Sequence, residues 1–340
     1  MSTAHAVRRP PAPAGGRPRA GSIPIGDDRA VTRYERLLAR ARTGEPILID
    51  GATGSEAVRR GVPETDHGWS GMSAVSHPDI VRSIHDDYLA LGAQMIASCT
   101  FATGKNICDD VGSPESFEAL NRRAVEIAVE ARDAYGDDDV VVAAGISNWS
   151  FARKPQPLDQ LLADTIEQAT IMRDSGADLI SLEMMCDIPR MTATLDAVST
   201  VGLPIWVGFS IGREEGLDVE DLPDPIPLRS EELLDGREDL LVDAVDVAKG
   251  YDVDAMFVMH TDTRLVEACL DAIRPRWDGV LGAYAHATAV IDGVLTFQDA
   301  ITPADYAAFV PSWRAAGATV IGGCCGIGPK HMHAVVEGGL

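Results

Sequence analysis

The chain repeats one pattern eight times: a short apolar run followed by an amphipathic stretch with helical spacing. The runs span residues 47–51, 94–100, 140–147, 178–185, 204–210, 255–260, 280–287 and 319–325. Near-continuous apolar runs of this length are typical of parallel strands buried on both faces. Eight strand–helix units, with no segment left over for a second domain, predict a single (β/α)8 TIM barrel over residues 31–340. An open doubly wound sheet is the alternative, but no GxGxxG motif follows the first run.

Three local features complicate this regular pattern. Residues 1–30 are rich in Pro, Arg, Gly and Ala, which predicts a disordered tail because little apolar surface is available to offset ordering entropy. The irregular segment 212–235 is long enough to cover the mouth of the barrel. Pro311 is expected to kink or break the helix predicted within residues 302–318.

The acidic composition argues against nucleic acids and anionic membranes as partners. The formal net charge is −23, and such a surface repels nucleic-acid backbones and anionic membranes, so we expect neither as a partner. No apolar run is long enough to span a bilayer and no secretory signal precedes the barrel, which predicts a cytoplasmic location. The six cysteines are irregularly spaced and do not resemble a disulfide framework. The sequence is compatible with a homo-oligomer.

Polar side chains gather at the ends of the apolar runs, where barrel enzymes place their active sites. The candidates are Asp50, Gly51, Thr100, Glu183, His260, Tyr284, His286, Cys324 and Cys325. A carboxylate is costly to bury without a partner, so Asp50 and Glu183 are expected to meet a cation or an amine. The alternative for each acid is a structural salt bridge or a helix cap.

Two adjacent cysteines, Cys324 and Cys325, end the eighth run within GGCCGIG. They could be inert buried thiols, a vicinal disulfide, a redox pair or part of a metal site. A vicinal disulfide requires a distorted peptide unit, redox pairs are more often spaced C-x-x-C, and the flanking glycines favour open backbone over packed core. Two thiolates and one imidazole with an open fourth position are typical of catalytic zinc. His260, at the end of the sixth run, is the candidate third ligand, although taken alone it could simply lead into the next helix.

The chain resembles the homocysteine S-methyltransferase family in four stretches: ILIDGATGSE, WSGMSAVSHPDIVRSIHDDYLALGAQMIASCTFAT, SGADLISLEMM with the later PIWVGFS, and GATVIGGCCGIGPKHMHAV. The resemblance runs from about residue 46 to residue 336, and the GGCCG turn is its most specific part. It implies a barrel that carries zinc at its mouth. In that family three cysteines hold the metal, and the thiol of the substrate takes the open position.

Residue by residue, the resemblance makes Cys324 and Cys325 two of the zinc ligands, and His260 stands where the family has its third cysteine. It implies that Asp50 and Glu183 hold the ammonium group of the substrate. The backbone around Gly51 and the hydroxyl of Thr100 could bind the substrate carboxylate.

The implied function is zinc-dependent transfer of a methyl group from a small onium donor to the thiol of homocysteine, which gives methionine. Trp149, Trp206 or Tyr284 could present a π surface to the cationic donor, although ordinary packing is favoured for Trp206. His260, and Ala285-His286 where the family has Pro-Asn, depart from the family pattern. They leave open a zinc methyltransferase or demethylase acting on another thiol, or a metal-binding relative without turnover.

Overall fold

The computed structural model describes residues 31–150, 152, 154, 156–211, 223, 226–228, 239–291 and 294–340. The tail predicted at residues 1–30 lies outside these ranges, so its disorder and its boundary stay predictions. Most of the irregular segment 212–235 lies outside them as well. Among the described residues, no helix combines the length and apolar character needed to cross a bilayer.

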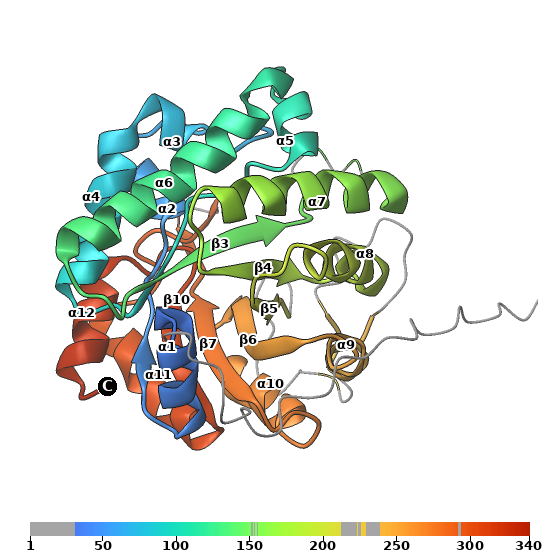
Figure 1. The fold of residues 1–340 in the computed structure, drawn as a ribbon. Coiled ribbons are helices and arrows are strands. Elements are labelled where there is room, and N and C mark those ends of the chain that lie inside the picture. Colours follow the sequence, from blue (N-terminus) through green and yellow to red (C-terminus); the bar gives the residue numbers. More distant parts are fainter. Residues whose placement is uncertain are drawn as a thin grey trace, which may run out of the picture. The chain divides into compact units, whose positions relative to one another are not determined.

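The predicted (β/α)8 barrel is confirmed (Figure 1). One eight-stranded parallel sheet has the order β1-β10-β7-β6-β5-β4-β3-β2. A parallel bridge between Ile49 and Met95 joins the first and last strands of this order and closes the sheet. The barrel strands are β1 (Ile47–Leu48), β2 (Met95–Ala97), β3 (Val141–Ser147), β4 (Leu179–Met185), β5 (Ile205–Phe209), β6 (Val253–Asp262), β7 (Val280–His286) and β10 (Ala318–Gly323).

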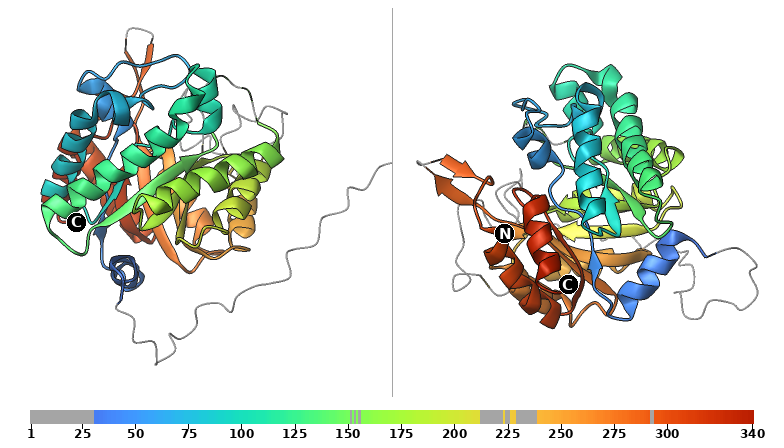
Figure 2. Two further views of the ribbon diagram at one scale, coloured as in Figure 1. Left: turned by 45° about the horizontal axis from the view of Figure 1, so that its top comes forward. Right: turned by 90° about the vertical axis from the view of Figure 1, so that its left-hand side faces the viewer.

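Helices surround the barrel, as the amphipathic stretches predict (Figures 1 and 2). They are α4 (Pro78–Ala90), α6 (Phe117–Tyr135), α7 (Leu158–Asp174), α8 (Ile188–Val198), α9 (Leu241–Ala248), α10 (Val266–Ile273), α11 (Pro303–Ala315) and α12 (Pro329–Glu337). Pro311 does not break the helix as the sequence allowed, because α11 continues through it. The buried Val310 and Trp313 anchor the helix on both sides of the proline, and their packing opposes the lost backbone hydrogen bond and the ring clash that a proline causes inside a helix.

The two largest apolar clusters of the described residues hold the fold together. The larger one lies between the strands and the surrounding helices. The other fills the inside of the barrel and includes Trp206 and Phe257 together with Tyr34 from α1 (Arg33–Arg42), the helix that precedes the first strand. The indole nitrogen of Trp206 donates a hydrogen bond of 3.0 Å to the Tyr34 hydroxyl, and that hydroxyl donates one of 2.7 Å to Asp254. Trp206 is therefore a packed core residue, which confirms the interpretation favoured from the sequence.

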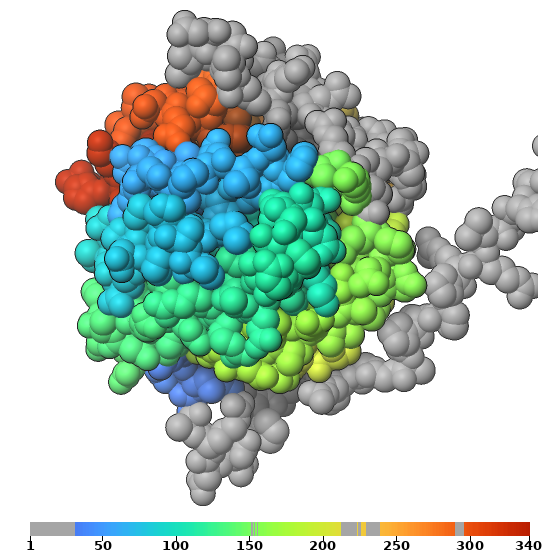
Figure 3. All heavy atoms as spheres, turned by 90° about the horizontal axis from the view of Figure 1, so that it is seen from above, coloured from blue at the N-terminus to red at the C-terminus, as the bar shows by residue number. Residues whose placement is uncertain are grey.

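Short elements follow the C-terminal ends of several strands and build the mouth of the barrel. They are α2 (Gly54–Arg59), α3 (Ser73–Ser76), α5 (Lys105–Asp110), η1 (Pro114–Ser116) and the antiparallel hairpin of β8 (Ala289–Ile291) and β9 (Val294–Thr296). The hairpin, in orange, projects from the barrel in both views of Figure 2. In the space-filling view of Figure 3 the orange segment lies next to the light-blue segment that contains α3. Two chain regions far apart in sequence thus meet at this end of the molecule.

Candidate metal and substrate site

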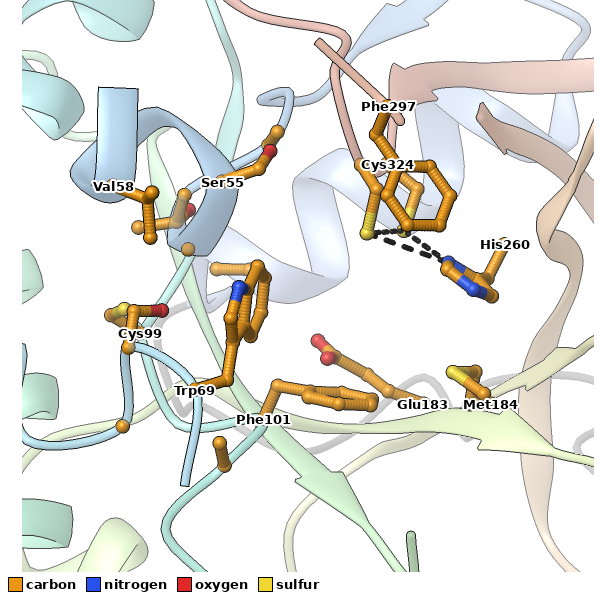
Figure 4. A pocket seen from close by; sticks show the side chains of 18 of the residues that line it. Ser55, Val58, Trp69, Cys99, Phe101, Glu183, Met184, His260, Phe297 and Cys324 are labelled. Carbon is orange, nitrogen blue, oxygen red and sulfur yellow. Dashed lines mark hydrogen bonds between the residues drawn. The ribbon is translucent and has the colours of Figure 1, made fainter. Parts of the chain in front are cut away.

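The residues predicted from the strand ends converge on one cavity of about 590 Å³. Its walls include six of the predicted residues: Thr100, Glu183, His260, Tyr284, Cys324 and Cys325. Asp50 and Gly51 lie behind these walls, and the Asp50 side chain is fully buried. Figure 4 shows Glu183 pointing into the cavity, with His260 and Cys324 facing each other nearby.

His260, Cys324 and Cys325 form a compact group of possible metal ligands. The His260 Nδ1 atom lies 3.5 Å from the Sγ atom of each cysteine, and the two Sγ atoms are 3.8 Å apart. His260 and Cys324 are buried and Cys325 is half-buried, so the group faces the cavity without being open to bulk water. Among the described residues these three make up the group suited to hold a metal ion.

The distances within this group match those of a tetrahedral metal site. With metal–sulfur bonds of about 2.3 Å and metal–nitrogen bonds of about 2.0 Å, a tetrahedron has S–S edges of about 3.8 Å and S–N edges of about 3.5 Å. The three atoms already lie at these separations. An ion of this size could therefore bind without rearrangement of the ligands, and a fourth position would remain for a substrate atom.

The turn that carries the two cysteines depends on a glycine. Gly326 has a φ angle of +78°, in the left-handed region, and a Cβ atom at this position would collide with the carbonyl oxygen of Phe297. Its backbone N–H donates a hydrogen bond of 3.0 Å to the Ser55 hydroxyl. The chain can thus turn sharply after Cys325 and keep both sulfur atoms on the same side.

Irregular backbone aims the ligands and the acid into the cavity. His260 and Met184 are non-glycine residues with positive φ angles of 45° and 56°. The pairing of β6 with β7 shifts register between Met259 and Asp262, and that of β4 with β5 shifts between Leu182 and Met185. Such bulges redirect side chains at barrel rims, and strained backbone concentrates at functional sites. Nothing in the sequence revealed these two bulges.

Glu183 is a buried acid with no cationic neighbour among the described residues. Within the described part of the chain, no hydrogen bond reaches its carboxylate, and its side chain is only 7% exposed. Burial, together with the nearby charge of Asp50, raises the pKa of Glu183 to about 8. The group therefore carries its proton at neutral pH until a cation enters the cavity.

Asp50 is held more firmly than Glu183. Its Oδ2 atom accepts a hydrogen bond of 2.6 Å from the Ala97 N–H, and its Oδ1 atom accepts one of 3.3 Å from the Tyr284 hydroxyl. Burial raises the pKa of Asp50 to about 7, although these two hydrogen bonds act in the opposite direction. Asp50 is thus fixed by two hydrogen bonds behind Tyr284.

The predicted carboxylate-binding residue Thr100 already has a partner. Its hydroxyl donates a hydrogen bond of 2.7 Å to the carbonyl oxygen of Gly145. The hydroxyl would have to give up this bond in order to donate to a substrate.

Aromatic and thioether side chains make up a further part of the wall. Besides the predicted Trp149 and Tyr284, the cavity is lined by Trp69, Phe101, Met184, Met259 and Phe297. The indole of Trp69 packs edge-on against Phe101, with ring centroids 6.3 Å apart. Trp69, Phe101 and Phe297 are not among the residues predicted from the sequence. Phe101 directly follows the predicted strand at residues 94–100, and this position was the signal that could have pointed to it. Trp69 and Phe297 lie farther from the preceding predicted strands, in loops that carry no such signal.

The remaining cysteines are not part of the ligand group. All six cysteines of the chain are free thiols. Cys99 lines the cavity, where its Sγ atom lies 3.4 Å from the Ser73 hydroxyl, and burial raises its pKa to about 11. Cys108, Cys186 and Cys269 are buried, in agreement with a packing role.

Comparison with known proteins gives a consistent result. The sequence profile of the homocysteine S-methyltransferase family matches residues 47–338. The chain is 25% identical to homocysteine S-methyltransferase 3 of Arabidopsis thaliana, over 87% of this chain and 90% of that protein. It is also 25% identical to a selenocysteine Se-methyltransferase of Brassica oleracea var. italica, over 91% and 93% of the two chains.

A similar enzyme from Escherichia coli provides a structural comparison. The curated homocysteine S-methyltransferase of Escherichia coli (strain K12) is 25% identical, over 85% of this chain and 94% of that one. The crystal structure of the homocysteine methyltransferase MmuM from Escherichia coli, in its metallated form, superposes with a TM-score of 0.71 at 22% identity. This superposition covers 90% of this chain and 99% of that one, and it supports the fold. Because the family profile covers most of the sequence, the chain belongs to the homocysteine S-methyltransferase family and is a methyltransferase.

Proposed function

We propose that this protein transfers a methyl group from a small onium donor to the thiol of homocysteine, producing methionine. One observation carries the proposal: a nitrogen and two sulfur ligands stand at tetrahedral separations in a cavity that also holds the buried acid Glu183. In this reaction the acceptor sulfur gains the methyl group, the donor loses it together with its positive charge, and the thiol proton leaves to solvent.

The metal is proposed to be zinc, held by His260, Cys324 and Cys325. Two soft sulfur ligands and one imidazole suit Zn²⁺, and three protein ligands with one open position are the pattern of catalytic sites. When bound, zinc would stabilise the acceptor thiol as a thiolate at neutral pH, so that no separate general base is needed.

His260 gives the site one unit less negative charge than three cysteines would. We therefore expect a lower pKa for a bound thiol, with more of the thiolate form present but lower intrinsic nucleophilicity of each thiolate.

Glu183 is proposed to bind the ammonium group of the acceptor. A cation beside this carboxylate favours its charged form, and the resulting ion pair is a charge-assisted hydrogen bond. Asp50 adds negative charge through its hydrogen bond with Tyr284. The backbone around Gly51 and the hydroxyl of Thr100 remain the candidates for the acceptor carboxylate, with Thr100 exchanging its bond to Gly145.

The aromatic wall is proposed to receive the onium donor. Trp69, Trp149 and Tyr284 line the same cavity as the ligand group, and aromatic faces attract cations, most strongly where water is excluded. A donor bound there would be close to the acceptor sulfur, and this proximity would supply much of the rate acceleration. Trp206 is not proposed to contact the donor, because it lies in the core of the barrel.

The test is a screen of donors against acceptors, with methionine detected by mass spectrometry. Betaine, S-methylmethionine and S-adenosylmethionine would each be offered with homocysteine, and Cys324→Ser would serve as the inactive control. No methionine from any of these donors, with zinc bound, would refute homocysteine as the acceptor. His260, in place of the third cysteine of the family, favours one second candidate function, methyl transfer to a different thiol. The same screen tests it by including cysteine, selenocysteine and glutathione as acceptors. Absence of zinc uptake would instead support a relative without turnover.

A further inference from the structure

We propose that His286 is a positioning residue, whose ring holds the imidazole of His260 with Nδ1 facing the two cysteine sulfur atoms. The inference rests on the proposed metal site and concerns a residue of β7 outside the ligand group. Its role would be to orient a ligand on the neighbouring strand β6.

The first observation is a cluster of three rings. The centroids of His260 and His286 are 4.4 Å apart and the rings are nearly perpendicular, at 78°. Phe297 contacts both, with centroids 5.6 Å from His260 and 5.3 Å from His286. Each ring therefore touches the other two. The His286 side chain is only 3% exposed, so it cannot move aside into water.

The second observation is that His260 has an unfavourable backbone conformation. Its φ angle is +45°, which costs a non-glycine residue free energy and persists only where the surroundings enforce it. The Nδ1 atom is bonded directly to Cγ, so ligation through Nδ1 ties the metal closely to the backbone position. A small rotation of the ring or relaxation of the bulge would then move Nδ1 away from both sulfur atoms.

The third observation is how firmly β7 holds His286. Its carbonyl oxygen accepts a hydrogen bond of 3.0 Å from the Thr263 N–H, and the residue pairs with Asp262 across the strands. The bulge in β6 lies between Met259 and Asp262, so His286 is fixed at the point where the regular pairing of β6 resumes. His260 and His286 both depart from the family pattern at the barrel mouth, and their rings are in direct contact.

The experiment compares His286→Ala, which removes the ring, with His286→Phe, which keeps a flat ring but removes both nitrogen atoms. Cobalt(II) would replace zinc, and its absorption spectrum would report the ligand set. Zinc affinity would be measured by competition with a chelator. His331→Ala is the matched control, because it removes an imidazole that packs on Tyr306, outside the three-ring cluster.

We expect His286→Ala to weaken zinc binding by roughly 10- to 100-fold, as loss of a residue supporting a ligand commonly does, and to change the cobalt spectrum. We expect His286→Phe and His331→Ala to retain wild-type affinity and spectrum. Should His286→Ala not fold, His286→Leu replaces it with the same expectation, because Leu fills the space without a flat ring.

Three outcomes would overturn the inference. Unchanged affinity and spectrum in His286→Ala would show that the ring is not needed. An equal loss in His286→Phe would assign the effect to the ring nitrogens instead of the ring contact. Loss of metal in His286→Ala while His260→Ala retains it would make His286 the ligand. Failure of the wild-type protein to bind zinc or cobalt would refute the proposed function itself, which distinguishes the two failures.

Discussion

Replacing Glu183 with glutamine should stabilise the ligand-free protein at neutral and alkaline pH, although it should damage substrate binding. The pKa of Glu183 is raised from 4.5 to about 8 by burial. A raised pKa means that the folded state binds this proton more tightly than the unfolded state does. The contribution of Glu183 to stability is therefore fully present below pH 4.5 and is lost as pH rises towards 8.

The size of this loss of stability follows from the difference between the two pKa values, 4.5 and about 8. A change of one pKa unit is worth about 1.4 kcal/mol, so the wild-type protein should lose on the order of 4 kcal/mol through this group by pH 8. Glu183→Gln removes the titration. Its free energy of unfolding should exceed that of the wild-type protein by an amount that grows from pH 6 to pH 8.

Urea unfolding followed by tryptophan fluorescence and circular dichroism, at several pH values between 6 and 8.5, would measure this difference. Glu64→Gln is the matched control, because Glu64 is an exposed carboxylate at the same cavity, and its stability profile should follow that of the wild-type protein. Glu183→Gln should also bind homocysteine more weakly than the wild-type protein does. Its binding of a homocysteine analogue that lacks the amino group should be unchanged. Parallel wild-type and Glu183→Gln profiles would refute the assignment of Glu183 as a buried, unpaired acid.

Further predictions concern the ligands, the donor and the core. Cys324→Ser should lose most bound zinc, as measured by metal analysis after dialysis, while circular dichroism should show an intact barrel; full retention of zinc would contradict the ligand assignment. Trp69→Leu should raise KM for the methyl donor more than KM for the acceptor thiol, since it removes one aromatic face; equal changes in both would argue against a donor role. Tyr34→Phe should reduce the free energy of unfolding by about 1–3 kcal/mol, because the buried Trp206 N–H loses its acceptor. Its kcat should stay at the wild-type value, and a large loss of kcat would show that this end of the barrel is coupled to the site.

The sequence predicted the architecture well because the signal is local. Each strand of a parallel barrel is buried on both faces, so it appears as an apolar run wherever it occurs in the chain. The strands carrying Glu183 and His260 were both found in this way. The break that Pro311 could have caused does not occur, since α11 continues through the proline with the buried Val310 and Trp313 on either side of it.

The candidate site was predicted only in part. Residue type and strand position were sufficient to single out His260, Cys324, Cys325 and Glu183, all of which line one cavity. The same reasoning predicted a cation or an amine beside Asp50, whose side chain is fully buried and accepts a hydrogen bond from the Tyr284 hydroxyl. Position at the end of a strand does not reveal whether a side chain reaches the cavity or stops in the layer beneath it. Trp69, Phe101 and Phe297 of the aromatic wall were missed because they come from loops, which carry no periodic signal.

The sequence by itself determined the fold class, the family and the identity of the candidate ligands, since all three depend on patterns that can be read along the chain. Only the tertiary structure decided how the side chains of the candidate site are arranged. His260 and Cys324 are separated by 64 positions in the sequence. The sheet order places β6, which carries His260, on one side of β7 and β10, which leads into Cys324, on the other. Two bulges, enforced by packing, then turn His260 and Glu183 into one cavity. The contact between His260 and His286 arises in the same way, because neighbouring strands bring residues together that the sequence keeps apart.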